Sequence, residues 1–168
     1  MLRRTLTLGT IVLTALALSA CSPVVALGPA EFAADPACAA VTVRLPDEIG
    51  DGDTTFPARE TNAQATGAWG DPVAVVLHCG VPTPPPTAEL PCVTTPGGVV
   101  DWLVDESRAP EFIFTSYGRT PAVTVVIDNT VISGVSVLEA IDAAVSQLPQ
   151  TGACVSIEDA PVGQDLQG

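Results

Sequence analysis

Alternation of apolar and polar residues in the second half of the chain predicts a small antiparallel sheet. Residues 73–79 place Val75, Leu77 and Cys79 on one face and His78 on the other, which is the period of a strand. Further stretches of this kind lie at 99–104, 112–117 and 122–128. Short links join these stretches, and short links favour antiparallel pairing over crossover connections. The pattern therefore predicts about four strands in a mostly antiparallel sheet.

Two helices are predicted, one at each end of this sheet-forming region. A helix over 36–45 is indicated because Asp35 is a typical N-cap and Pro36 suits the first helical turn. A second helix over 136–148 is indicated by capping-box spacing from Ser136, followed by apolar residues at steps of three and four. Together with the strands, these helices predict one small α+β domain.

The remaining segments are predicted to be irregular. Residues 47–68, rich in Asp, Thr, Gly and Asn, are assigned to loop, and the proline-rich residues 81–91 to an extended loop. Residues 21–34 show little periodicity and are predicted to form a flexible tether. The acidic residues 157–168 are predicted to form a loose tail. The α+β domain is thus expected over residues 35–156.

Residues 1–20 predict export from the cytoplasm. Arg3 and Arg4 precede a short apolar run, and small residues end that run just before Cys21. The run is too short to span a membrane, since a span needs about 20 apolar residues. Residues 18–21, Leu-Ser-Ala-Cys, resemble a bacterial lipobox. The resemblance implies cleavage before Cys21, diacylation of its thiol and attachment to the outer face of the cytoplasmic membrane, by either the general or the twin-arginine export route.

The charge of the chain excludes nucleic acid as a partner. Six basic residues face nineteen acidic ones, giving a formal charge of −13. Loss of Arg3 and Arg4 with the signal segment makes the mature chain more acidic still. Such a surface repels phosphate backbones. We attribute the acidity to solubility outside the cell and expect no nucleic-acid partner.

The cysteines predict two disulfides. With Cys21 assigned to the lipid anchor, the even set Cys38, Cys79, Cys92 and Cys154 remains. An even number in an exported chain favours disulfides over a metal site, and here no pair has C-x-x-C spacing. No metal and no cofactor is predicted. Of the three possible connectivities, Cys79–Cys92 with Cys38–Cys154 is preferred, although the sequence leaves the choice open.

Four strings in the chain carry a resemblance to a known family. They are AWGDP at 68–72, VVLHCGVP at 75–82, VDWLV at 100–104 and FTSYGRTPAV at 114–123. In this order they resemble the DUF3515 family, an actinobacterial family of secreted or lipid-anchored proteins, over roughly residues 36–155. The resemblance implies a location in the cell envelope. It implies no known activity and supplies no catalytic residues.

Catalytic arrangements are incomplete in the sequence. A nucleophile needs a neighbouring base, and His78 is the only histidine, with Ser107, Ser116 or Ser133 as possible partners. No G-x-S-x-G motif is present to position a serine. Close carboxylate pairs such as Asp101 with Asp105 are expected by chance among nineteen acids. No catalytic residue is therefore predicted.

A calcium site and a ligand pocket are also disfavoured. Residues 47–53 carry acids and glycines but lack the EF-hand register and its closing glutamate, so a mobile acidic loop is the preferred interpretation. A domain of this size with its apolar residues concentrated in one sheet leaves little volume for a pocket.

Three residues are candidates for an interaction surface: Trp69, Tyr117 and Arg119. Residues of these types commonly anchor protein interfaces. The first hypothesis is therefore a non-enzymatic, lipid-anchored envelope protein that binds another envelope protein or a cell-wall component. The alternatives are a small cell-wall hydrolase using His78 and carboxylates, and a carrier for a small ligand. An exposed patch around Trp69 and Arg119 would favour the first, and a cleft joining His78 to a carboxylate or serine would favour the second.

Overall fold

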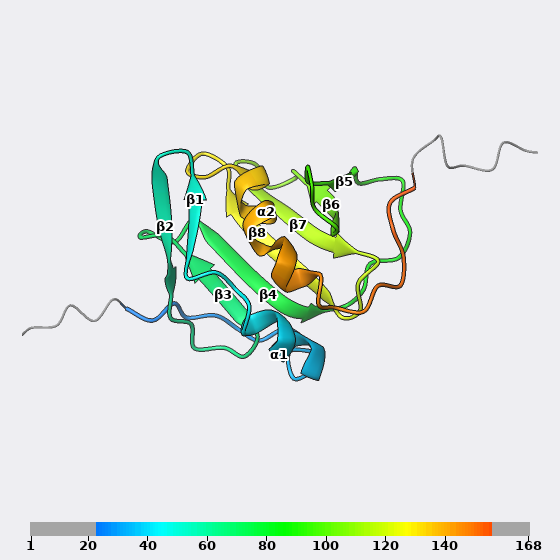
Figure 1. Cartoon of the computed structure of the whole chain (residues 1–168), viewed down its shortest axis with the longest axis horizontal. Helices are drawn as coiled ribbons and strands as arrows, with labels where there is room; N and C mark the ends of the chain where they lie inside the picture. Colours follow the sequence, from blue (N-terminus) through cyan, green and yellow to red (C-terminus); the bar gives the residue numbers. More distant parts are fainter. Residues whose placement is uncertain (1–22, 156–168) are drawn as a thin grey trace, which may run out of the picture.

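Eight strands in the computed structural model form one antiparallel sheet, and two helices cover one of its faces (Figure 1). The structure describes residues 23–155. The helices are α1 (Pro36–Thr42) and α2 (Gly134–Val145). The strands are β1 (Glu48–Asp51), β2 (Thr54–Arg59), β3 (Thr66–Trp69), β4 (Val75–Val81), β5 (Cys92–Thr94), β6 (Asp101–Asp105), β7 (Glu111–Tyr117) and β8 (Ala122–Asp128).

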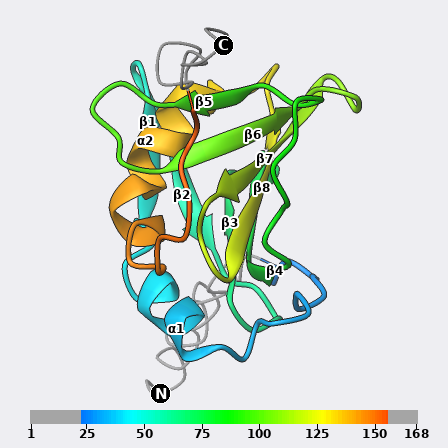
Figure 2. The ribbon, with the colours of Figure 1, turned by 90° about the vertical axis from the view of Figure 1, so that its right-hand side faces the viewer.

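The sheet joins two meanders, each of four consecutive strands. Its strand order is β1-β2-β3-β4-β8-β7-β6-β5, so β4 pairs with β8 in the middle, while β1 and β5 are the two edges. The proline-rich segment after β4 must therefore travel from the middle of the sheet to its far edge. Figure 2 shows this segment passing along the side of the sheet away from the helices.

The core lies between the sheet and the helices. Alternate strand residues such as Leu77 and Val125 are fully buried there, as are Leu138, Ile141 and Val145 on α2. The strands also curl at the β1 end so that β1 contacts α2. The inward-facing side chains thus make one continuous apolar core, and the opposite face of the sheet remains outside it.

The predicted four-stranded α+β fold is wrong, because the sheet has eight strands and the domain is mostly β. The strands predicted near 73–79, 99–104, 112–117 and 122–128 are present as β4, β6, β7 and β8. Two of the missed strands, β1 and β2, fall within the predicted loop 47–68, and β3 begins in that loop and ends at Trp69. β1 and β2 each bury a single residue, Ile49 and Phe56, so the alternation that reveals a half-buried strand is absent there.

The predicted helices are present with different ends. α1 begins as expected, because the Asp35 carboxylate accepts the Ala37 N–H at 2.8 Å, but it ends at Thr42. α2 begins at Gly134, before the predicted capping box, and its N-cap Ser133 makes no capping bond with its own side chain. The helix start is instead held from β1. There Asp51 accepts the Ser133 N–H at 2.9 Å and the Ser136 hydroxyl at 2.8 Å.

The Asp51 carboxylate therefore joins the curled edge of the sheet to α2. The Ser133 N–H bond, and after it the Ser136 hydroxyl bond, lower the pKa of Asp51 below its ordinary value of 3.8. A group whose pKa is lowered by folding stabilises the fold above its unfolded pKa, and that contribution is lost as the pH falls through the folded pKa. The contact is therefore present at neutral pH and is removed by acid.

We expect Asp51→Asn to lower stability at neutral pH and to do so less as the pH falls. The difference in unfolding free energy between wild type and variant should shrink as the pH falls below the ordinary pKa of 3.8 and Asp51 becomes protonated. Urea unfolding at a series of pH values measures this difference, with Asp53→Asn in the exposed turn of the same hairpin as the control. The pKa values of Asp105 and Asp128 are also lowered, but these groups are common to both proteins and cancel. A difference that stays constant with pH would contradict the assignment.

Two disulfides are present, as the sequence predicts, but the preferred pairing of the four cysteines is wrong. The bonds join Cys38 to Cys79 and Cys92 to Cys154. Cys79 and Cys92 stand on β4 and β5, which are four positions apart in the sheet, or about 19 Å at the usual strand spacing. A disulfide requires Cα atoms within about 7 Å of each other. Cys79 instead points to the helix side, where α1 presents Cys38 at a Cα–Cα distance of 5.6 Å.

The prediction of a flexible tether is wrong for residues 23–34, because this segment is hydrogen-bonded to the sheet. The Val25 N–H donates to the Glu60 carbonyl at 2.8 Å, and the Phe32 N–H donates to the Gly80 carbonyl at 2.7 Å. Gly80 has φ +97°, and a Cβ there would lie 2.4 Å from the Phe32 carbonyl carbon, so the close approach requires glycine. The segment is thus part of the folded body.

Several sequence predictions lie outside the described residues. They are the signal segment 1–20, the anchor residue Cys21 and the acidic tail 157–168. Among the described residues, none of the helices is both long enough and apolar enough to cross a membrane.

Candidate functional site

The face of the sheet opposite the helices carries the candidate site, which we call the outer face. It consists of six residues on three neighbouring strands: Val76 and His78 on β4, Thr124 and Val126 on β8, and Ile113 and Thr115 on β7. The strand register aligns them in two rows across the sheet. One row is Val76–Val126–Ile113, and the other is His78–Thr124–Thr115.

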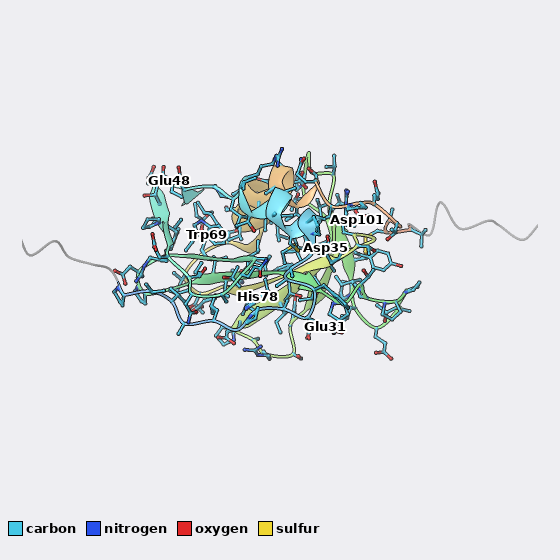
Figure 3. The ribbon with its side chains drawn as sticks, turned by 90° about the horizontal axis from the view of Figure 1, so that it is seen from below. Glu31, Asp35, Glu48, Trp69, His78 and Asp101 are labelled. Carbon is cyan, nitrogen blue, oxygen red and sulfur yellow. A yellow bond between two sulfur atoms is a disulfide. The ribbon has the colours of Figure 1, made fainter. Side chains whose placement is uncertain are left out.

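The two-residue period of the strands creates the outer face. Leu77, Phe114 and Val125 occupy the intervening positions and are buried against the helix side, while all six residues of the outer face are partly exposed. Figure 3 shows Trp69 on the helix side of the sheet and His78 on the opposite side. A solvent-facing sheet surface is ordinarily polar, so a row of three branched apolar side chains there is unusual. Such a row suits contact with another molecule.

His78 has threonines beside it in the sheet and no catalytic partner in register. Its cross-strand neighbours are Thr66 on β3 and Thr124 on β8. The serines considered with it lie elsewhere. Ser116 is fully buried on the helix side, where its hydroxyl accepts the Val123 N–H, and Ser133 begins α2. The remaining serine, Ser107, follows β6 in the turn that leads to β7.

The carboxylates Asp101 and Asp105 are each engaged by local hydrogen bonds. Asp101 accepts the Thr94 hydroxyl on one oxygen and the Cys154 N–H at 2.7 Å on the other. Asp105 accepts the Ser107 N–H at 2.9 Å, and hydrogen bonds from Ser107, first from its side chain, lower the pKa of Asp105. These acids hold a sheet edge and a turn in place. The described residues thus bring together neither of the two arrangements expected of a hydrolase.

Two of the three predicted interaction residues are buried. Trp69 is 1% exposed, and its indole N–H donates to the Pro46 carbonyl at 2.9 Å. Arg119 is 5% exposed and donates to backbone carbonyls at the end of α2. Tyr117 alone is partly exposed, opposite Asp101 on the outer side of the sheet. The predicted patch around Trp69 and Arg119 is therefore wrong, because sequence cannot tell a buried arginine from an exposed one.

A shallow open depression of about 350 Å³ lies between the β1–β2 hairpin and the loop before α2. Its only charged lining group is Asp51, which already accepts two hydrogen bonds from α2. The predicted mobile loop 47–53 contains β1 and the turn of this hairpin and is ordered by pairing of β1 with β2. Within residues 23–155, side chains that could hold a metal do not gather in groups of three. The depression thus offers little to a ligand.

The arginines of residues 23–155 are all engaged within the fold. Arg59 pairs with Asp71 at 3.1 Å, Arg108 pairs with Glu111, and Arg44 donates to the Ala40 carbonyl. Arg119 is buried. Since the whole chain has nineteen acids and six basic residues, the protein carries a strong net negative charge. A binding partner is therefore favoured if its own surface is positively charged.

The alternation of residues 73–79 places Val76 together with His78 on this face, but sequence reasoning did not identify the four residues on β7 and β8 as part of it. The alternation within residues 112–117 and 122–128 marks these four, since Ile113, Thr115, Thr124 and Val126 each stand next to a buried residue of the core face. Alternation within one strand does not predict the strand order, and it is the strand order that places β4, β8 and β7 next to one another.

Comparison with known proteins finds one family. The family described as a protein of unknown function, DUF3515, matches residues 4–153 of the chain. No curated protein and no solved structure shows a match.

Proposed function

The chain belongs to the DUF3515 family, and from this premise we propose that it is a lipid-anchored envelope protein whose outer face binds a positively charged surface of another envelope protein. The observation that carries the binding role is the partly exposed apolar row Val76–Val126–Ile113 on a sheet face that neither α1 nor α2 covers. Mixed apolar and hydroxyl side chains on a partly exposed sheet face are suited to a protein partner.

The export part of the proposal has two supports. Two disulfides link cysteines that are distant in sequence, and such bonds persist in oxidising compartments. The sequence also places a basic start, a short apolar run and small residues directly before Cys21. Two acyl chains on Cys21 would hold the chain firmly to a membrane, whereas one chain alone binds only marginally.

The chemistry of the partner follows from charge. With a formal charge of −13 and the described arginines engaged internally, the protein attracts cationic surfaces and repels anionic ones. A basic protein domain therefore suits the outer face better than an anionic polymer does. His78 and the threonines beside it would supply hydrogen bonds across the interface.

A photocrosslinking residue at position 124, in the centre of the outer face, is expected to give one discrete protein adduct in intact cells. The matched control carries the same residue at position 139, which is exposed on α2 on the other side of the domain and should give no such adduct. Val126→Arg replaces apolar contact with a charge of the partner's sign. It should reduce the adduct about tenfold, which corresponds to about 1.4 kcal/mol of binding.

Three outcomes would contradict the proposal. They are equal adducts from positions 124 and 139, an adduct from position 124 that survives Val126→Arg unchanged, and an adduct to an acidic partner. Circular dichroism of Val126→Arg checks that the fold is retained. This check is needed because residue 126 lies in the central strand β8.

A further inference from the structure

The first described residue of the chain is held in place by an arginine. Arg59 Nη2 donates to the Pro23 carbonyl at 3.0 Å, while Nη1 donates to the Gly70 carbonyl at 3.0 Å and pairs with Asp71 at 3.1 Å. The Arg59 side chain is only 7% exposed. A guanidinium fixed by three partners can hold the backbone of Pro23 against the ends of β2 and β3.

The next residues continue this attachment. Val25 donates to the Glu60 carbonyl at 2.8 Å and accepts the Asn62 N–H at 3.3 Å, which forms a parallel bridge with Thr61. The Leu27 N–H then donates to the Asn62 side-chain oxygen at 2.7 Å. Residues 23–27 are therefore held in a fixed position relative to the sheet.

Chain length then limits how far an anchor on Cys21 can be from this part of the domain. Cys21 is two residues before Pro23, and an extended chain spans at most about 3.6 Å per residue. The Cα atom of Cys21 therefore lies within about 7 Å of the Cα atom of Pro23. An acylated Cys21 places its lipid chains in the bilayer, so the surface around Pro23 must lie close to the headgroups.

We infer that the domain is held in one orientation on the membrane. The end formed by residues 23–25, 59–62 and 70–72, which we call the anchor end, faces the phospholipid headgroups. This inference rests on the lipid anchor of the proposed function. Figure 1 shows the described chain beginning at one end of the long axis of the molecule and finishing at the other, beside β5. The β5 edge, with the Cys92–Cys154 bond, therefore points away from the membrane.

The attachment of residues 23–27, rather than charge attraction, sets this orientation. The anchor end exposes Val24 (53%), Glu60 and Asp71. Its one arginine is buried and already paired, so acidic side chains face the headgroups. Anionic lipids would repel them, and a domain on a flexible tether would turn this end away. Rigid attachment two residues from the lipid opposes that rotation.

The orientation also positions the outer face. Strands β4, β8 and β7 lie one to three strand positions beyond β3, at about 4.8 Å per step. The outer face therefore begins one strand from β3 and extends away from the anchor end along the side of the molecule. A partner anchored in the same membrane can reach it laterally.

Fluorescence quenching by lipids tests the orientation. The full chain, purified with its native lipid and reconstituted in phosphatidylcholine vesicles with nitroxide on the headgroups, carries a fluorescent amino acid at position 60 or at position 93. Position 60 is at the anchor end, whereas position 93 is on β5 at the opposite edge of the sheet. We expect quenching about threefold or more stronger at position 60, since several strand spacings of about 4.8 Å separate the two positions.

An inserted linker provides the matched variant. About twelve Gly and Ser residues between Ser22 and Pro23 keep the anchor but add roughly 20 Å of flexible reach. The two positions should then be quenched to the same extent. The orientation is overturned if anchored wild type shows equal quenching at both positions, or if the insertion leaves their difference unchanged.

Cys21→Ser separates this inference from the proposed function. The variant should no longer bind the vesicles, because it lacks the thiol that carries the lipid. If it binds as wild type does, the lipid anchor itself is wrong. If it is released while anchored wild type is quenched equally at positions 60 and 93, the anchor stands and only the orientation is overturned.

Discussion

Replacing both Cys38 and Cys79 with alanine is expected to lower the free energy of unfolding by about 4 kcal/mol. The bond closes a loop with a sequence separation of 41, and cross-linking such a loop restricts the unfolded chain. It also joins α1 to β4 in the middle of the sheet. Urea unfolding followed by the fluorescence of Trp69 and Trp102, both buried, measures the loss.

The second disulfide serves as the comparison. Cys92–Cys154 has a separation of 62, so its removal is also expected to cost about 4 kcal/mol. Reduction of both bonds should lower the free energy of unfolding by an amount comparable with the whole stability of a typical domain, about 5–15 kcal/mol. Much of the protein should then unfold. Fragment mass spectrometry of the oxidised wild type should recover Cys38 linked to Cys79. A fragment that links Cys79 to Cys92, or an alanine variant as stable as wild type, would contradict the assignment.

Arg119→Met is expected to cost about 3 kcal/mol of stability, although no carboxylate pairs with this arginine in the described structure. Its guanidinium donates to the carbonyls of Leu148 at 3.0 Å and Ser146 at 3.4 Å, just after α2, and to that of Val99 at 2.8 Å. Methionine has a similar length but no donors, so it leaves buried carbonyls without partners. It also removes a positive charge from the end of a helix where charge of that sign is favourable.

The matched control makes the same chemical change at an exposed site. Arg108→Met breaks a pair with Glu111 in which both side chains are at least half exposed, and such pairs contribute about 1 kcal/mol or less. Arg119→Lys should fall between wild type and Arg119→Met, because an ammonium group keeps the charge without the planar fork. Urea unfolding of the four proteins measures the series. Equal losses from Arg119→Met and Arg108→Met would show that the buried bonds contribute little.

The residues by which the chain resembles its family serve the fold. Trp69 and Trp102 fill the core, Gly80 admits the backbone of Phe32, and Arg119 holds the end of α2. Gly118 has φ +64°, and a Cβ there would lie 2.0 Å from the carbonyl oxygen of Gly152. Each residue type therefore has a packing reason. Their shared order identifies the family, and Val76, His78 and Thr115 of the outer face lie within the same strings.

Strand prediction succeeded where a strand has one buried face along its whole length. β4 and β8 lie in the middle of the sheet and bury alternate residues against α2, so a period of two is visible in their sequences. β5 is a three-residue edge strand whose residues are at least partly exposed, and its sequence shows no such period. The same limit applies to the site: His78 could be placed on an outer face, but its neighbours in other strands could not.

Several features of this protein were determined by the sequence itself, because they depend on residue type and local spacing. These are the helix start at Asp35, the strands β4, β6, β7 and β8, the even set of cysteines, the acidic charge and the family. Tertiary structure alone decided the strand order, the disulfide pairing, the burial of Arg119 and the attachment of residues 23–27 to the sheet. Each of these depends on contacts between residues far apart in the chain, and local residue patterns carry no record of which distant segments will meet.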